Sequence, residues 1–289
     1  MTDLKTVRGV FEAGSEHWVG DGFPVRNLFP SNGLVAQMDP FLMLDYAGPV
    51  EFPPSAAPKG VGEHPHRGFE TVTIAYRGAV EHRDSTGSSG IIFPGDVQWM
   101  TAASGVVHEE MHEREFARQG GVFEMVQLWV NLPAAHKMSK PGYQAITSAQ
   151  IPEVTFGEGA KARVIAGELH GVKGPAQTFT PVNVFDVRMA AGSSGELALP
   201  AGHHSALIVL RGSITVNGTA VDEDARLVLL SDEGAGVQLE ASKDALLLVL
   251  TGEPLNEPVA SYGPFVMNTQ AEIMQAINDY RAGRMGRLS

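Results

Sequence analysis

Glycine and proline interrupt the apolar segments of this chain so often that little room is left for long helices. The 289 residues include 33 Gly and 18 Pro, spread along the whole length. Short apolar runs bounded by such turn residues are typical of an all-β sandwich or barrel. We expect strands at residues 69–76, 90–93, 123–132, 183–190, 205–210, 213–218, 226–230 and 244–250.

One helix is predicted at the C-terminal end, over about residues 269–282. Thr269 and Glu272 have the spacing of a capping box, and Gly283 follows the last residue of the pattern. Between them, apolar side chains recur with the spacing of one helix face: Ile273, Ala276, Ile277 and Tyr280.

An internal repeat predicts two β units in tandem. The segments "TVTIAYRGAVEH" (71–82) and "ALIVLRGSITVN" (206–217) share a strand, an Arg-Gly turn and a second alternating strand. The segment 131–144 is polar and contains prolines, which suits a boundary between domains. We therefore expect one domain over residues 1–135 and another over residues 136–289.

The composition limits the classes of partner and site. The absence of cysteine excludes disulfides, thiolate zinc sites, iron–sulfur clusters and a cysteine nucleophile, so nitrogen and oxygen must hold any metal. A net charge of −12 argues against direct binding of nucleic acid. The N-terminal segment lacks the apolar core of a signal peptide, and no apolar run is long enough to cross a membrane. We therefore expect a cytoplasmic protein with no membrane contact.

Four side chains have the spacing of a metal site built on strands. His64 and His66 are two residues apart, and His108 and Glu110 repeat that spacing after a turn expected at residues 93–96. Residues two apart on a strand share a face, so the two pairs can close a site of three histidines and one carboxylate inside a barrel. Such ligands suit one divalent ion, above all Fe(II), with Mn, Ni, Co, Cu or Zn as substitutes.

Other residues near these four are expected to have different roles. Glu70 shares the parity of His64 and His66, and we expect it to hydrogen-bond a ligand imidazole. His112 shares the parity of His108, but we expect the strand to end before it and leave it in solvent. The remaining histidines are adjacent or isolated and are expected to be ordinary polar residues: His17, His82, His136, His170, His203 and His204.

The letters "HEEMH" (108–112) also fit the His-Glu-x-x-His pattern of zinc peptidases. On a helix, His108 and His112 would share a face and Glu109 would activate water. On a strand, Glu110 would face the metal and Glu109 would point away. Two β-branched valines before the motif are poor helix formers, and the third ligand of the known peptidase families does not follow it. We therefore prefer the strand interpretation.

Four segments together resemble the pirin family over nearly the whole chain: "DPFLMLDYAGP" (39–49), "HPHRGFETVTIAYRGAVEHRDSTG" (64–87), "PGDVQWMTAASGVVHEEMHE" (94–113) and "GEPLNEPVASYGPFVMNTQAEIMQAINDY" (252–280). The resemblance implies two tandem cupin β-barrels of the jelly-roll type, with the C-terminal helix packed back on the body. It also implies one metal ion, usually iron, in the N-terminal barrel. The family's metal ligands fall on His64, His66, His108 and Glu110.

The second domain is expected to lack a metal site. The offset of the repeat places Ala198 and Pro200 where His64 and His66 stand in the first domain. Neither side chain can bind a metal, and His204 falls opposite Glu70 rather than opposite a ligand.

The resemblance implies two alternative functions. The first is an iron-dependent dioxygenase of the quercetin 2,3-dioxygenase type, which opens a flavonol such as quercetin with dioxygen. Glu110 would then be a metal ligand and would also accept the proton of the substrate hydroxyl. The second is a non-enzymatic, redox-sensing regulatory partner of a transcription factor or a metabolic enzyme. An open apolar cavity beside the metal would favour the enzyme, and a closed mouth with an exposed patch would favour the regulator.

Overall fold

The computed structural model describes residues 3–29 and 34–288 of the chain. It contains two compact units, each assembled from three stretches of sequence. Unit 1 comprises Met1–Gly14, Asn27–Pro40 and Ala149–Pro254, and unit 2 comprises Ser15–Arg26, Phe41–Ser148 and Leu255–Ser289. These units differ from the contiguous halves expected at residues 135 and 136. The first stretch of the chain joins the later barrel, and the last stretch joins the earlier one.

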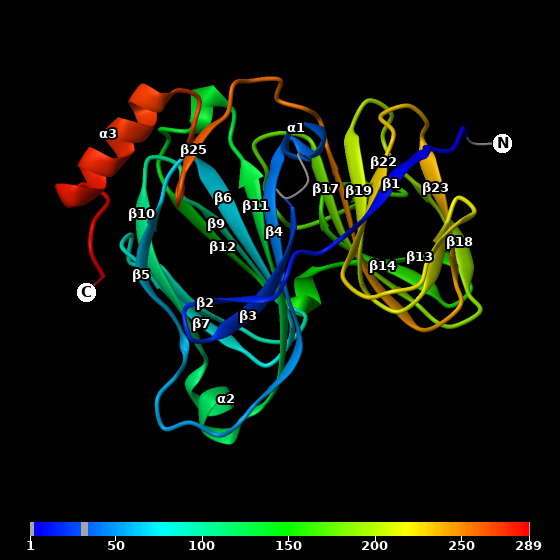
Figure 1. Cartoon of the computed structure of the whole chain (residues 1–289), viewed down its shortest axis with the longest axis horizontal. Coiled ribbons are helices and arrows are strands. Elements are labelled where there is room, and N and C mark those ends of the chain that lie inside the picture. Colours follow the sequence, from blue (N-terminus) through cyan, green and yellow to red (C-terminus); the bar gives the residue numbers. More distant parts are fainter. Residues whose placement is uncertain (1–2, 30–33, 289) are drawn as a thin grey trace. The chain divides into compact units, whose positions relative to one another are not determined.

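Unit 2 is built on a seven-stranded and a four-stranded antiparallel sheet (Figure 1). In sheet order, the seven strands are β12 (Gly142–Ile146), β9 (Val97–Thr101), β6 (Phe69–Arg77), β11 (Gly121–Asn131), β4 (Phe41–Phe52), β3 (Phe23–Phe29) and β2 (His17–Val19). The four strands are β5 (Gly60–His66), β10 (Val106–His112), β7 (Val80–Asp84) and β8 (Ser89–Ile92). The remaining elements are helix α2 (Arg114–Gln119), the hairpin β25 (Ala260–Tyr262) and β26 (Phe265–Met267), and helix α3 (Gln270–Arg281).

Unit 1 has the same two kinds of sheet. In sheet order, its seven strands are β1 (Val7–Glu12), β22 (Arg226–Leu230), β19 (His204–Arg211), β24 (Ala245–Gly252), β17 (Val182–Met189), β14 (Ala160–Ala166) and β13 (Glu153–Gly157). The four strands are β18 (Ser194–Ala198), β23 (Gly236–Ala241), β20 (Ile214–Val216) and β21 (Thr219–Val221). The minor elements of unit 1 are α1 (Val35–Met38) and the pair β15 (Glu168–Leu169) and β16 (Val172–Lys173). Two short 3₁₀ helices lie at Ala134–His136, in unit 2, and at Ser148–Gln150, where the chain passes from unit 2 to unit 1.

The predicted repeat corresponds to equivalent strands of the two units. β6 and β7 carry its first copy, and β19 and β20 carry its second, at matching places in the sheet orders. One end strand of the large sheet comes from a different part of the sequence in each unit. The end of the large sheet that β12 occupies in unit 2 is occupied in unit 1 by β1, which pairs antiparallel with β22 (Figure 1). The N-terminal strand therefore completes the barrel formed by later residues, and the connecting strand β12 completes the other.

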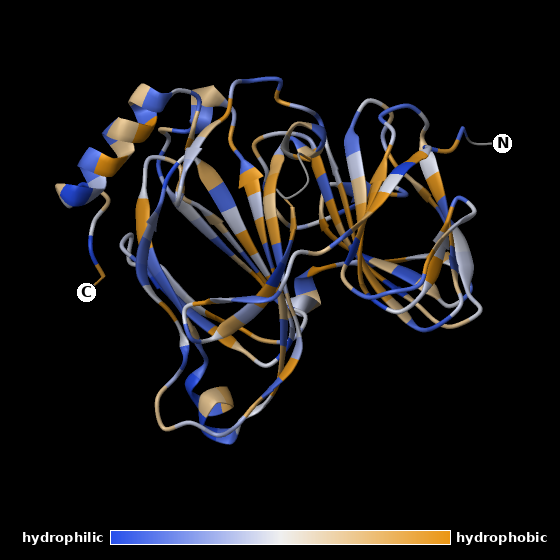
Figure 2. Ribbon diagram, viewed as in Figure 1, coloured by the Kyte–Doolittle hydropathy of each residue, from blue (hydrophilic) through white to orange (hydrophobic). Residues whose placement is uncertain are grey.

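Both units bury hydrophobic and polar residues, but the buried histidines and glutamates among the described residues all lie in unit 2. Hydrophobic residues recur along the strands of every large sheet (Figure 2). In unit 1 they form one cluster that includes Phe185, Leu207 and Leu247. In unit 2, strands β6, β7, β9 and β10 also bury polar side chains: Glu70, Thr71, Thr73, His82, Asp84, Gln98, Thr101, His108 and Glu110. Burial of polar groups is costly unless they have partners. The concentration of buried polar side chains on these four strands therefore indicates a candidate site.

The C-terminal helix α3 forms as predicted. Thr269 caps it, and the side chains of Thr269 and Glu272 make the reciprocal bonds of a capping box. Asp279 on the buried side of α3 accepts a hydrogen bond from Arg67 at 2.8 Å, which ties the helix to the turn after β5. Among residues 3–29 and 34–288, none of the helices combines the length and apolarity needed to span a bilayer.

Candidate metal centre

The "HEEMH" segment is a strand and not a helix. Its residues form the end of β10, which pairs antiparallel with β5 on one side and β7 on the other. Burial alternates along it, since His108 and Glu110 are buried whereas Glu109 and Met111 are partly exposed. Glu109 points outward and accepts a hydrogen bond from Arg83. The strand interpretation is therefore confirmed, and the peptidase interpretation is wrong.

The three predicted histidines lie together. β5 and β10 are neighbours in register, with His64 opposite His108 and His66 opposite Val106. The ring centroid of His108 lies 4.2 Å from that of His64 and 4.9 Å from that of His66. One ring nitrogen from each of the three lies within 4.8 Å of the others. This spacing suits three ligands of a single metal ion.

Glu110 belongs to a second group that shares His108. Ligand atoms of His82, His108 and Glu110 lie within 4.8 Å of one another, and His82 is the cross-strand partner of Glu110 on β7. The Oε1 atom of Glu110 accepts hydrogen bonds from Thr73 Oγ1 at 3.1 Å and from Gln98 Nε2 at 3.3 Å. These two bonds fix the orientation of the carboxylate.

Two imidazoles of the centre, those of His66 and His108, have lowered pKa values and buried nitrogen atoms without a hydrogen-bond partner among the described residues. Burial lowers the pKa of His108 well below its usual value, and the neighbouring histidines His66, His64 and His82 lower it further. Burial, together with His64, lowers the pKa of His66 in the same way. Among the described residues, neither His108 Nε2 nor His66 Nδ1 has a hydrogen-bond partner, although both atoms are buried. His64 Nδ1 pairs with the carbonyl of Gly62 at 2.8 Å, which leaves its Nε2 available. Unprotonated, partnerless nitrogens are the donors that a divalent ion requires.

A cavity of about 440 Å³ opens beside these residues. His64, His66 and Glu110 line it together with Asp45, Gln127 and Pro264. The rest of its wall is apolar: Val19, Phe23, Val25, Met43, Val61, Met125 and Trp129. A largely apolar cavity with a few polar groups on one wall is the usual form of a small-molecule site.

The environment of His112 corrects one expectation. β10 extends through His112, and α2 begins only at Arg114, so His112 still faces inward and is 2% exposed. Its Nε2 pairs with the carbonyl of Gly22 at 2.9 Å, and burial lowers its pKa. Its ring packs against phenylalanine rings: Phe23, Phe52, Phe116 and Phe123. His112 is a core residue rather than a solvated one.

His82 corrects a second expectation, because it is neither isolated nor on the surface. It is fully buried in β7, and its Nδ1 lies 3.3 Å from His108 Nδ1. Its parity with Asp84 could be read from the sequence, but nothing in the sequence places β7 beside β10. Glu70, which was expected to contact a ligand imidazole, accepts instead a hydrogen bond from Thr101 Oγ1 at 2.7 Å. Burial raises the pKa of Glu70 to about 7, against the lowering effect of that hydrogen bond.

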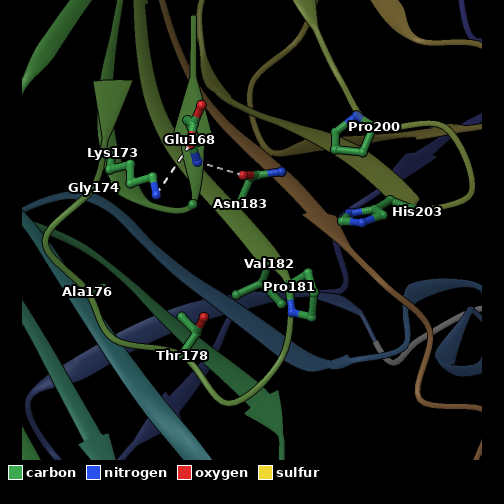
Figure 3. Close-up of a pocket in the computed structure, with 11 residues that line it drawn as sticks. Glu168, Lys173, Gly174, Ala176, Thr178, Pro181, Val182, Asn183, Pro200 and His203 are labelled. Atoms are coloured by element: carbon green, nitrogen blue, oxygen red, sulfur yellow. Dashed lines mark hydrogen bonds and ion pairs between the residues drawn. The ribbon is translucent and has the colours of Figure 1, made fainter. Parts of the chain in front are cut away.

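Unit 1 has a hollow of about 490 Å³ with a different lining (Figure 3). Pro200 and His203 lie on one side of it, and Glu168 and Lys173 lie on the other. Asn183 accepts a hydrogen bond from the backbone of Glu168 at 3.0 Å. Among the described residues, His203 is the only histidine that lines it. The groups of three or more possible ligands that residues 3–29 and 34–288 contain are the two described above, and both lie in unit 2.

Comparisons with known proteins agree with this architecture. The family model described as Pirin matches residues 22–130, and the model of the pirin C-terminal cupin domain matches residues 184–286. A Pseudomonas aeruginosa protein provisionally named quercetin 2,3-dioxygenase is 54% identical over 282 residues, which cover 97% of this chain and 98% of that protein. A pirin-like protein of Caulobacter vibrioides is 40% identical over 281 residues, which cover 96% of this chain and 99% of that protein.

A solved structure is similar along the whole chain. The crystal structure of a quercetin 2,3-dioxygenase from Acinetobacter baumannii is 52% identical, with a TM-score of 0.96, and the match covers 99% of this chain and 100% of that one. The two family models, the relatives and this likeness agree, and the chain belongs to the pirin family, with two cupin domains in tandem.

Proposed function

We propose that the chain is a mononuclear metal protein in which His64, His66, His108 and Glu110 hold one divalent ion, most favourably Fe(II). The cluster of three histidines supports this, because two of their buried nitrogens have no other partner among the described residues. Glu110 would add a negative charge to the lining of the cavity that His64 and His66 also line. Nitrogen and carboxylate ligands without sulfur suit iron and its first-row neighbours.

The proposed activity is that of a dioxygenase that opens a flavonol such as quercetin with dioxygen. The single observation that carries it is the apolar cavity of about 440 Å³ beside the histidines. Its volume falls in the range of roughly 300–1,000 Å³ that is common for small-molecule sites. The names of relatives such as the Acinetobacter baumannii protein point to the same substrate class. A regulator that only senses redox state would have no need of such a cavity.

The residues of the chain would divide the work as follows. Iron, when bound, would supply a coordination position and a path for electrons from the flavonol, which is the group oxidised, to dioxygen. Trp129, Phe23 and Met125 would pack against the flat rings of the flavonol and exclude water. Glu110 would accept the proton of the substrate hydroxyl, while Thr73 and Gln98 hold its carboxylate in place.

Oxygen uptake by the iron-loaded protein tests the proposal. Quercetin should cause oxygen consumption, and an analogue that lacks the 3-hydroxyl should not, because it has no proton to give to Glu110 and no oxygen to direct at the metal. Glu110→Ala should abolish uptake, whereas Glu109→Gln, a matched change on the outer face of the same strand, should not. Iron-loaded protein that consumes no oxygen with any member of a flavonol panel would refute the dioxygenase and favour the regulatory alternative.

A further inference from the structure

His82 and Asp84 form a buried pair directly behind the candidate metal centre. Both lie on β7, and the side chains of His82 and Asp84 are 0% and 2% exposed. His82 Nδ1 lies 3.3 Å from His108 Nδ1, and His82 Nε2 lies 3.3 Å from Asp84 Oδ2. The His82 ring also stacks on the ring of Tyr143, with centroids 5.0 Å apart and planes at 17°. His82 is therefore held on both edges and one face.

The three side chains admit one arrangement of protons when a cation is bound. The partnerless nitrogen of His108 is Nε2, so a cation at that atom leaves the ring proton of His108 on Nδ1. That proton can only be donated to His82 Nδ1, which must then be unprotonated. His82 carries its own proton on Nε2 and donates it to Asp84 Oδ2. Each step follows from the one before it.

Asp84 is itself fixed by its surroundings. Its Oδ1 accepts hydrogen bonds from Thr86 N at 2.8 Å, Thr86 Oγ1 at 2.6 Å and Ser88 N at 3.2 Å. The carboxylate therefore cannot rotate away from His82 without losing three bonds. Histidine ligands of metals usually donate their second ring N–H to such a fixed acceptor, which sets the tautomer and the direction of the ring.

We propose that His82 and Asp84 are positioning residues that hold His108 with Nε2 unprotonated and directed at the metal. This inference rests on the metal centre proposed above. It assigns to His82 the supporting contact that parity had suggested for Glu70. An alternative use of the same atoms is a second ion held by His82, His108 and Glu110, and the experiment distinguishes the two.

The experiment compares Co(II) affinity, measured by competition with a chelator, for the wild-type chain and three variants. His82→Leu removes the acceptor and should weaken Co(II) binding by roughly 10–100-fold. His82→Asn places a carbonyl oxygen near the position of Nδ1 and should recover most of that loss. His112→Phe removes another buried histidine of the same unit and should bind Co(II) like the wild type. Equal affinity for His82→Leu, His112→Phe and wild type would overturn the inference.

A second measurement does not depend on how the variants fold. Long-range ¹H–¹⁵N spectra of the histidine rings in the zinc-loaded wild-type protein should show the proton of His108 on Nδ1 and that of His82 on Nε2. A proton on His82 Nδ1 would overturn the inference. A stoichiometry of two zinc ions per wild-type chain and one per His82→Leu chain would also overturn it, because His82 would then be a ligand of a second ion. A wild-type chain that binds neither Co(II) nor zinc would refute the proposed function itself, an outcome distinct from metal binding that ignores His82.

Discussion

Glu70 makes the stability of unit 2 depend on pH in a direction that can be worked out. The residue is 1% exposed, and burial raises its pKa to about 7 from an ordinary 4.5. The folded chain therefore keeps a proton on Glu70 up to about pH 7, whereas the unfolded chain releases it near pH 4.5. The folded state binds more protons in that window, so stability falls as the pH rises, by about 1.4 kcal/mol per pH unit.

The change Glu70→Gln isolates this effect. Glutamine has the same size and keeps an oxygen that can accept from Thr101, but it does not titrate. Any cost of burying its amide is the same at every pH. The free energy of unfolding of the wild type, minus that of the variant, should fall by about 2.5 kcal/mol between pH 5 and pH 8.

Urea unfolding followed by tryptophan fluorescence can measure this difference within unit 2. All three tryptophans, Trp18, Trp99 and Trp129, lie in the unit that contains Glu70. A chelator in every sample removes the contribution of metal binding. Added salt should leave the result unchanged, because the cause is burial and not surface charge. A wild-type-minus-variant difference that stays constant from pH 5 to pH 8 would show that Glu70 is ionised in the folded chain and would refute the reasoning.

Three other outcomes are expected. Glu110→Ala should weaken Co(II) binding by more than the roughly 10–100-fold typical of a supporting residue. The controls Glu109→Gln and His112→Phe should bind Co(II) like the wild type. Equal affinity in all three variants would show that Glu110 is not a metal ligand. Elemental analysis of the whole chain should find about one first-row metal ion per molecule, and a value near two would contradict a single centre. Asp279→Asn should lower the free energy of unfolding by about 3 kcal/mol, because the buried guanidinium of Arg67 loses its carboxylate. A loss below about 1 kcal/mol in urea would mean that this pair behaves like one at the surface.

The parts of the site that the sequence could predict are those set by neighbours along one strand. Side chains two residues apart must share a face, so the pairs His64 with His66 and His108 with Glu110 followed from the strand assignment alone. The same rule predicted that Glu109 points outward. The helix α3 was predictable for a similar reason, because its cap and its apolar face are both local.

The parts that could not be predicted depend on which strands become neighbours. His82 contacts His108 because β7 pairs with β10, and no local pattern in either strand specifies that partner. His112 was misjudged because the strand continues through it into a polar stretch, where phenylalanines from β3, β4 and β11 cover its ring. The alternating pattern of β1 indicates a strand, but it does not say which of two similar sheets that strand will join.

Because β12 and β1 occupy equivalent ends of the two large sheets, the strands of the two units become complete at different times during synthesis. Once residue 146 has been made, every strand of the seven-stranded and four-stranded sheets of unit 2 is present in the nascent chain, because β12 follows soon after β11. β1 ends at Glu12 and its partner β22 begins at Arg226, so the hydrogen-bonding edge of β1 stays unpaired until β22 has been made. Unpaired strand edges are prone to wrong association. The sheets that carry the candidate metal centre can therefore pair earlier in synthesis than the large sheet of unit 1. β1 is the strand whose unpaired edge is exposed longest to wrong association.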